Sequence, residues 1–552
     1  MEKGKKNFSL WTVHINSKHT NINCKVHFSN RFRNDKVYRN DEYGIAIFDG
    51  VLLNKSELLQ KYKVEELDSL LKKAYQNISI LAEFTGPFTG FLYNKMEHKG
   101  LTFGNQTGDA SVFYRVQGDE LFISNNFNAL STVGPNSLDE KAAHYLLTYG
   151  FIVDDSTIIK EVKRVRAGQY LSLSEKSLSI KRYHKIQFLD KLDITMDEAC
   201  EELDKRFRKA VKRCFDKDLE YGFNTHLADL SAGLDSRMTN WVASDMGYKN
   251  IINLSYSQSR SNEQKYTEDL GKVLGNTLYF RPLDDCSFLY KPDEIILQEF
   301  AMAYYCGITG GYEFLSLIDF DKFGLEHTGQ IGDAVVGKFT RSQTDERQIN
   351  LDTKRNSTLL PLRFVPDTSA YTCEDEFTYY TRMAQGALAT HYIRANYTYT
   401  VSPFMDIDMI NFCFRLPDSL RLNHRLYWYW IDHKYPKAGK IPSSRKRPQN
   451  KINSFIYRGT NKAWRESMTF LHYFHITRSS VSSNNMNPHT FWYETKAELR
   501  DFINNYYNNH INLTKNYPCL YEEVLKMSHS RIALDKLMGV SLLAAIKQYI
   551  KK

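Results

Sequence analysis

Six residues near the middle of the chain, 231–236 (S-A-G-L-D-S), have the composition of an anion-binding turn. They follow a short apolar stretch at 225–230 and precede apolar residues at helical spacing over 238–246. A strand that runs into a helix through small residues presents unpaired N–H groups at the positive end of the helix, where phosphate binds. Ser231 and Ser236 add hydroxyl donors. Asp235 fits such a site only if a cation, as Mg²⁺ does, bridges its carboxylate to phosphate oxygens. An ordinary strand–helix turn with a capping serine is the alternative.

The elements that must position this turn alternate along the chain. Helices are predicted over 194–215, 262–274 and 295–304, and strands over 225–230, 250–256, 277–282 and 324–327. This alternation indicates an α/β fold with a doubly wound parallel sheet, in which ligands bind at the carboxyl ends of the strands. Leu254 and Tyr256 are candidate walls for an adenine, although plain core packing explains each of them equally well.

Residues 1–185 have a different pattern. Short runs of β-branched and aromatic residues, such as F-T-G-F-L-Y-N at 88–94, are cut by Gly, Asn and Asp, and one helical pattern interrupts them over 64–82. This region therefore predicts a separate, β-rich domain ahead of the parallel sheet.

Three stretches resemble motifs of a known family. The turn at 231–236 resembles the pyrophosphate-binding SGGLDS motif of ATP pyrophosphatases, with Ala232 in place of a glycine. Residues 328–334 resemble the SGEGxDE motif of asparagine synthetases. There Thr328, Gly329 and Asp333 match, whereas Gln330, Ile331 and Ala334 differ. Residues 400–417 resemble the R-x-PFLD segment of that family through Pro403, Phe404 and Asp406, without its Arg. The motifs follow one another in the family's order.

The resemblance implies two domains. Residues 1–185 would form a degenerate glutaminase-like domain of the four-layer αββα, Ntn-hydrolase-like type, and residues 195–552 an asparagine synthase-like ATP pyrophosphatase domain. The implied ATP-binding residues are Ser231, Gly233, Leu234, Asp235, Ser236, Leu254 and Gly329. Asp235 and Asp333 would hold Mg²⁺ against the pyrophosphate. Asp333 and Lys446 are the implied catalytic residues. Lys446 is chosen from the basic cluster with Arg445, Arg447 and Lys451 to meet the negative charge of an acyl-adenylate.

The glutaminase chemistry of the family is not matched. Its nucleophile is a Cys directly after the initiator Met, where this chain has Glu2, and the first Cys is Cys24. The family's Asn-Gly-Glu stretch falls on residues 49–51 (D-G-V), and its Arg-Asp pair falls on 104–105 (G-N). We therefore expect the protein not to release ammonia from glutamine. Two alternatives remain open: Cys24 replaces the nucleophile, or the chain starts at a different Met.

Bulk properties narrow the function classes. The 552 residues are 42% hydrophobic and 25% charged, and a net charge of +9 is spread over interleaved acids and bases, which does not favour a nucleic-acid partner. The sequence holds no long apolar run, so no membrane span is expected. Eight Cys without a C-x-x-C pair favour a reduced, cytoplasmic protein. Self-association as a homodimer is left open.

The function expected from these observations is an ATP-dependent, amide-forming ligase. It would adenylate a small-molecule carboxylate, release pyrophosphate, and transfer the acyl group to ammonia or another amine, with ATP and Mg²⁺ as cofactors. The acid and the amine are not fixed, because the family forms asparagine, lactams and sugar-acid amides. A catalytically silent relative that binds a nucleotide or a partner enzyme is the alternative. A tRNA-modifying pyrophosphatase is disfavoured, because neither a catalytic Cys pair nor a strongly basic face is evident.

Overall fold

Alternating inward-facing residues build two antiparallel sheets from the first half of the chain. The structure is a computed structural model, and it describes residues 9–550 except 17–20, 176, 309–310, 341–348, 444–465, 469, 472–473 and 475–478. In strand β1 (Leu10–Ile15), Trp11, Val13 and Ile15 are buried, whereas the residues between them are half-buried. The inner residues of both sheets meet in one apolar layer that includes Trp11, Ile47 and Phe91.

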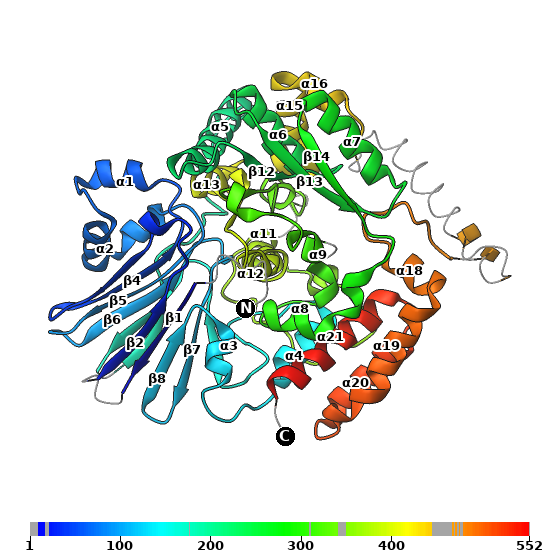
Figure 1. Cartoon of the computed structure of the whole chain (residues 1–552), viewed down its shortest axis with the longest axis horizontal. Helices are drawn as coiled ribbons and strands as arrows, with labels where there is room; N and C mark the ends of the chain where they lie inside the picture. The colour runs from blue at the N-terminus through cyan, green and yellow to red at the C-terminus, as the bar shows by residue number, and fades with distance from the viewer. Residues whose placement is uncertain are drawn as a thin grey trace.

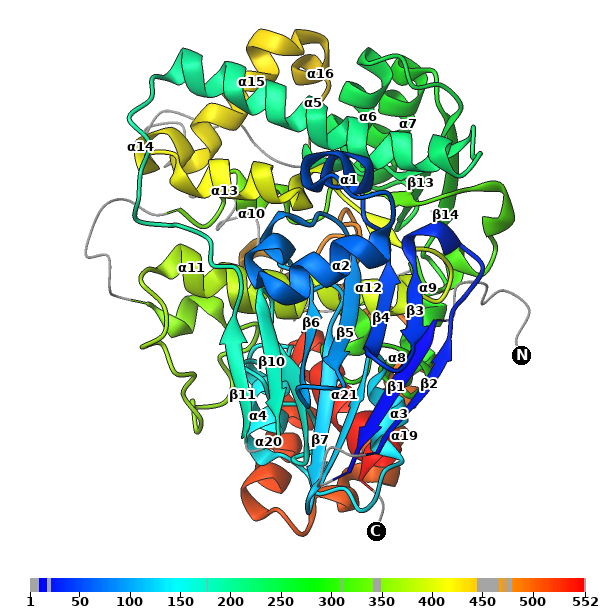
Figure 2. The ribbon, with the colours of Figure 1, turned by 90° about the vertical axis from the view of Figure 1, so that its left-hand side faces the viewer.

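Helices cover the outer faces of both sheets. Strand β4 (Gly44–Gly50) is buried on both sides, because Ile45 and Ile47 face the other sheet while Ala46 and Phe48 pack against α1 (Lys55–Tyr62) and α2 (Leu67–Gln76). On the opposite side, α3 (Phe127–Ser131) lies on the other sheet, and α4 (Glu140–Thr148) joins the same apolar cluster. The first half is thus a four-layer αββα arrangement (Figures 1 and 2).

The strand order of each antiparallel sheet is as follows. One sheet runs β2 (Ile22–His27), β1, β8 (Glu120–Ser124), β7 (Val112–Gln117) and β9 (Val162–Val165). The other runs β11 (Ser177–Arg182), β10 (Gln169–Ser174), β6 (Lys99–Gly104), β5 (Phe88–Asn94), β4 and β3 (Val37–Asn40).

The second half contains a five-stranded sheet in which every pair of neighbouring strands is parallel. Its order is β14 (Thr277–Pro282), β13 (Ile251–Ser257), β12 (His226–Asp229), β15 (Glu326–His327) and β16 (Thr400–Val401). Ala228 and Ile251 face a core shared with α5 (Met196–Glu220) and α6 (Asp235–Asp245), whereas Leu227 and Leu254 face the core of α8 (Pro292–Gln298) and α12 (Thr390–Arg394). Helices therefore cover both faces of the sheet.

The remaining helices complete this half. They are α7 (Asn262–Leu274), α9 (Gly311–Leu315), α10 (Gly332–Val335), α11 (Glu374–Thr378), α13 (Ile407–Arg415), α14 (Asp418–Arg421), α15 (Arg425–Lys434), α16 (Pro436–Lys440), α18 (His489–Thr495), α19 (Ala497–His510), α20 (Pro518–His529) and α21 (Ala533–Tyr549). Of these, α20 and α21 pack against α4 of the first half, and α19 packs against α21 (Figure 1). Among the described residues, no helix combines the length and the apolar character needed to cross a bilayer.

Capping residues and long-range contacts explain where the predicted limits of helices and strands agree with the structure and where they do not. Helix α7 and strand β14 begin and end where predicted. The Ser261 hydroxyl caps the first turn of α7, and Gly275 ends the helix with a left-handed φ of 71°. The prediction of a helix over 295–304 is wrong beyond residue 298. There Phe300 and Ala301 adopt φ of 61° and 53°, and Ala303 pairs with Phe151 of the first half. A long-range contact thus overrides the helical pattern.

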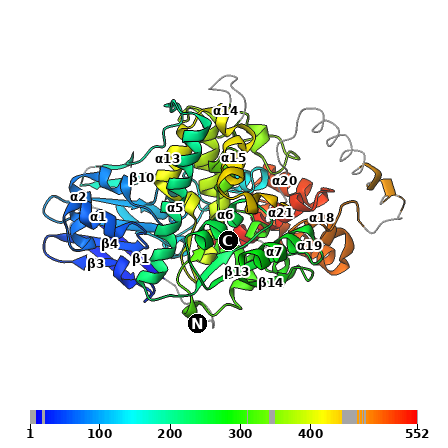
Figure 3. The ribbon, with the colours of Figure 1, turned by 90° about the horizontal axis from the view of Figure 1, so that it is seen from above.

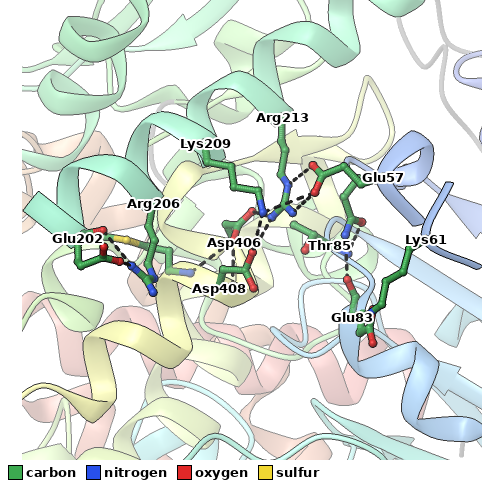
Figure 4. A network of polar contacts seen from close by, with 12 residues as sticks. Glu57, Lys61, Glu83, Thr85, Glu202, Arg206, Lys209, Arg213, Asp406 and Asp408 are labelled. Atoms are coloured by element: carbon green, nitrogen blue, oxygen red, sulfur yellow. Dashed lines mark hydrogen bonds and ion pairs between the residues drawn. The ribbon is translucent and has the colours of Figure 1, made fainter. Parts of the chain in front are cut away.

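A buried arginine joins the two halves (Figure 4). Arg213, on α5, donates from Nε and Nη2 to the two carboxylate oxygens of Glu57 on α1, at 2.7 and 2.6 Å. Its Nη1 donates to the buried carboxylate of Asp406 at 2.7 Å and to Asp408 at 3.2 Å. The other oxygen of Asp406 caps α13 by accepting from the Asp408 N–H at 2.9 Å. The acid of the matched PFMD segment therefore has a structural role here.

Replacing Arg213 with methionine is expected to lower the free energy of unfolding by about 3–5 kcal/mol, because Asp406 would stay buried without its cation. Urea unfolding followed by tryptophan fluorescence measures this change. Lys212→Met is the matched control, because Lys212 is the adjacent residue, is mostly exposed, and pairs with Asp216 one turn away. Its loss should cost about 0.5 kcal/mol or less. Equal effects of the two substitutions would contradict the assignment.

Candidate functional site

A cavity of about 250 Å³ opens at the carboxyl ends of β12, β13 and β15. Strand β12 is central: the chain moves outward through β13 to β14 on one side and then returns to β15 on the other. Ligands of open α/β sheets bind at this kind of topological switch point. The cavity therefore lies where the fold itself favours binding.

Most of the residues predicted from sequence line this cavity together. Those that do are Ser231, Gly233, Asp235, Ser236, Leu254, Gly329 and Asp333, and Tyr256 lines it too. Leu234 does not: its side chain is fully buried in the core shared by α5 and α6, at the position that precedes α6. Only its backbone could serve a ligand. Lys446 lies outside the described residues.

The turn after β12 is held by its own hydroxyls. The Ser236 Oγ accepts from the Ser231 N–H at 2.9 Å and lies 2.8 Å from the Ser231 Oγ, which in turn accepts from the Gly233 N–H at 3.3 Å. The Ala232 N–H donates to the carboxylate of Glu263 on α7 at 2.6 Å. Burial raises the pKa of Glu263. The sequence analysis missed this contact, because nothing but its place in the first turn of α7 marks Glu263.

Arg237 ties the turn to the segment that precedes Lys446. Its guanidinium donates to the carbonyls of Ala232 at 3.3 Å, Ile441 at 2.8 Å and Pro442 at 2.7 Å. Burial lowers the pKa of Arg237 to about 10, so that it stays charged at neutral pH. The Ser443 hydroxyl also donates to the Ala232 carbonyl, at 3.0 Å. The chain therefore reaches residue 443 beside the turn, three positions before Lys446 in the sequence.

Two acidic residues, Asp235 and Asp333, come into contact where the loop after β15 meets the first turn of α6. The Asp333 N–H donates to Asp235 Oδ2 at 3.0 Å, and the Tyr427 hydroxyl donates to Asp235 Oδ1 at 3.1 Å. Lys338 Nζ lies 2.5 Å from Asp333 Oδ2. Carboxylate oxygens are the ligands that Mg²⁺ prefers. The backbone of Asp333 thus contacts the Asp235 carboxylate, and both acidic residues line the cavity.

The contact between these loops requires glycine. A Cβ on Gly329 would lie 2.2 Å from the Ser236 nitrogen, and one on Gly332 would lie 2.8 Å from the Asp235 Cβ. Between them, the buried Ile331 has a φ of 57°, a left-handed conformation that costs a β-branched residue on the order of 1–3 kcal/mol. Strain is therefore stored in the loop that carries Asp333.

A second polar group lies at the end of β12 and was missed by the sequence analysis. Arg394, buried on α12, pairs with Glu326 Oε1 and lies 3.3 Å from Asp229 Oδ2. Asp229 lines the cavity. Its burial raises the pKa of Asp229 to about 7, with Arg394 opposing and Glu326 adding to the shift. Strand β12, which the sequence analysis describes as apolar, thus ends in the ionisable Asp229 at the cavity wall.

Within the described residues, Asp218, His226 and His327 form another group that could hold a metal ion. All three are buried, and both imidazoles lie 2.7 Å from the same Asp218 oxygen. These are hydrogen-bond distances, and they tie α5 to β12 and β15. The group therefore fits a structural role, in which it holds α5 against β12 and β15.

A smaller cavity, of about 110 Å³, lies between the two halves, where the resemblance places the glutamine site. Its Asp49 accepts from Tyr399 at 3.1 Å and from Asn125 at 3.2 Å. Cys24 lies on β2 and is not among the lining residues. Burial raises the pKa of the Cys24 thiol to about 11, which keeps it protonated and unsuited to nucleophilic attack. The geometry thus weighs against Cys24 as a replacement nucleophile.

Comparison with known proteins identifies a domain of the first half. Residues 37–184 match the model of the glutamine amidotransferase domain family, and the chain therefore carries an Ntn-type amidotransferase domain. No curated protein matches the chain. Among solved structures, glutamine phosphoribosylpyrophosphate amidotransferase from B. subtilis, complexed with ADP and GMP, is similar at 9% identity over 50% of this chain and 76% of that chain, with a TM-score of 0.24. A structure titled the allosteric regulatory enzyme of purine biosynthesis is similar at 10% identity, over 50% and 75%, with a TM-score of 0.23. Both TM-scores are too low to indicate a shared fold.

Gly329→Ala is expected to lower the free energy of unfolding by about 1–3 kcal/mol, because the added methyl group would push the loop carrying Asp333 away from α6. Thermal or urea unfolding measures the change. Gly271→Ala on α7 is the matched control, since its Cβ would meet its nearest atom at 3.5 Å, an ordinary contact. Alanine should stabilise that helix by up to about 1 kcal/mol. An unchanged stability of Gly329→Ala would refute the close contact.

Asp229→Asn is expected to flatten the pH dependence of stability. A carboxyl whose pKa is raised to about 7 in the folded state binds its proton more tightly than in the unfolded chain. The stabilisation of the folded state by protonated Asp229 is therefore complete below about pH 4. It is lost as the pH rises to 7, and the free energy of unfolding falls by at most about 1.4 kcal/mol per pH unit. Urea unfolding from pH 4 to 8 should show the parent losing more stability than the variant. Parallel pH curves would argue against the shift.

Proposed function

We propose that the protein is an ATP-dependent, amide-forming ligase of the asparagine synthetase-like type. One observation carries this proposal: the turn at 231–236 and the loop at 328–333, which match two motifs of that family in order, line one cavity at the switch point of a parallel sheet. The amidotransferase-type domain at 37–184 supports it, because enzymes with such a domain transfer amide nitrogen.

The residues of the cavity fit the two steps of the reaction. A substrate carboxylate oxygen attacks the α-phosphorus of ATP, and the bond to the pyrophosphate oxygen breaks. Ser231, Ser236 and the Gly233 N–H would hold the departing pyrophosphate. An amine nitrogen then attacks the acyl carbon, AMP leaves, and the nitrogen loses a proton. Lys446 would stabilise the negative charge that develops on the acyl-adenylate.

Asp235 and Asp333 are the residues that would hold Mg²⁺. The fit rests on their oxygen donors and on the contact of their loops, through the 3.0 Å bond from the Asp333 N–H to Asp235 Oδ2. Bound there, the ion would neutralise phosphate charge. Tyr427 fixes the orientation of the Asp235 carboxylate from the opposite side.

The nitrogen source in this proposal is ammonia or a small amine. Residues 49–51 are D-G-V in place of the family's Asn-Gly-Glu stretch, and the Cys24 thiol is held protonated. The smaller cavity, with Asp49 engaged by Tyr399 of the second half, would then serve the structure more than glutamine hydrolysis.

A nucleotide-binding relative without ligase activity is the second candidate. The contact that favours it is the bond from the Ala232 N–H to Glu263 at 2.6 Å, since a carboxylate there competes with a phosphate oxygen for the same donor. Pyrophosphate release separates the two candidates, because a silent relative binds ATP without cleaving it.

ATP with Mg²⁺ is expected to raise the thermal midpoint of the parent protein, and Asp235→Asn is expected to lose most of that shift. Ligand at 100 times its Kd adds about 2.7 kcal/mol of stability. Asp245→Asn is the matched control, because Asp245 is the last residue of the same helix, is half exposed and pairs with Arg208. Its thermal shift with ATP should equal that of the parent.

A parent that shows no thermal shift at millimolar ATP would refute nucleotide binding. Pyrophosphate release with ammonium and a panel of acids then tests the ligase.

A further inference from the structure

The cavity at the carboxyl edge of the sheet has two chemically different ends. At one end, Ser231, Gly233 and Ser236 line the cavity with two hydroxyl groups and the backbone of the turn. At the other, Asp229 presents a carboxyl group beside Leu254, its register partner on β13. A carboxylate repels phosphate, so the phosphates of a bound nucleotide would lie away from Asp229. The Asp229 end is therefore left for the uncharged part of the nucleotide.

Asp229 has acceptor capacity that the described residues do not use. A carboxylate accepts up to about four hydrogen bonds. The cation at Asp229 is Arg394, 3.3 Å from Oδ2, whereas Oδ1 is enclosed by protein and has no hydrogen-bond partner among the described residues. A fifth of the side-chain surface is exposed. Because Oδ1 is enclosed, a ligand that brings a hydroxyl or amino donor to this wall would bind the carboxylate through Oδ2, beside Arg394.

Buried neighbours fix the direction of this carboxylate. Arg394, 7% exposed, bridges Asp229 and Glu326, and the Thr400 hydroxyl donates to Glu326 Oε2 at 3.0 Å. Arg394 and Glu326 are thus positioning residues, because they act on the ligand only through Asp229. A carboxylate held this way discriminates between ligands by the place of their donors.

The chain itself limits which donor Asp229 can reach. Asp229 precedes Ser231 by two residues, and two extended residues span at most about 7 Å. The sugar follows directly after the α-phosphate of a nucleotide, whereas the far edge of the base lies beyond it. We propose that Asp229 accepts a hydrogen bond from a ribose hydroxyl and so selects ribonucleotides over deoxyribonucleotides. This inference rests on the nucleotide site of the proposed function.

Calorimetric titration of the full chain at about pH 8, above the raised pKa of Asp229 of about 7, with ATP, 2′-deoxy-ATP and 3′-deoxy-ATP, each with Mg²⁺, tests the inference. The parent should bind ATP at least about tenfold more tightly than one of the two deoxy forms, as expected for a hydrogen bond to a charged group. Asp229→Leu should bind all three equally. Asp229→Asn keeps an acceptor oxygen and the shape of the side chain, so its preference should fall to a few-fold.

Asp119→Asn, in the exposed turn between β7 and β8, is the control and should keep the preference of the parent. Equal binding of the three nucleotides by the parent would overturn the inference while leaving the proposed function standing. A preference retained by both Asp229 variants would overturn it as well. A parent that binds none of the three would overturn the proposed function and this inference with it.

Discussion

The loop after β15 lies against the first turn of α6 more closely than any residue but glycine permits at position 329. This contact brings together two segments that are about a hundred residues apart in sequence. The bond from the Asp333 N–H to Asp235 fixes one carboxylate relative to the other. The cavity and the two acidic residues that line it, Asp235 and Asp333, depend on that approach, and the strained backbone of Ile331 lies in the same loop.

Contacts from the first half support the sheet that carries this site. Arg31, from the first half, donates to the carbonyls of Phe320 at 2.7 Å and Gly324 at 2.7 Å, just before β15. Arg213 joins α1 to α5 and to the segment before α13. The views in Figures 1 and 3 show the αββα layers directly beside the helices that flank the parallel sheet. The amidotransferase-type domain is thus part of the framework that positions β15.

Periodicity and motif order predicted much of this architecture. The alternation of helices and strands predicted the parallel sheet, and the turn at 231–236 with Asp333 predicted which residues share a cavity. Glu263, Asp229 and Arg394 could not be found this way, because each gains its role from a partner distant in sequence. The helix expected over 295–304 ends early for a similar reason, since the pairing of Ala303 with Phe151 is invisible to a local pattern. Leu234 shows the remaining limit: a motif names the residue, but not whether its side chain or its backbone serves the site.

The bond between Arg213 and Glu57 also bears on how such a protein changes over evolutionary time. Glu57 belongs to the first half, yet the cation it engages is the one that neutralises the buried Asp406 of the second half. A substitution of Glu57 in the first half would therefore also disturb the environment of Asp406 in the second. A domain coupled in this way can lose its own chemistry and still be retained, because its deletion would leave exposed the arginine and the apolar surfaces that it covers. Packing alone therefore gives the protein a reason to keep its first half, whatever chemistry that half performs.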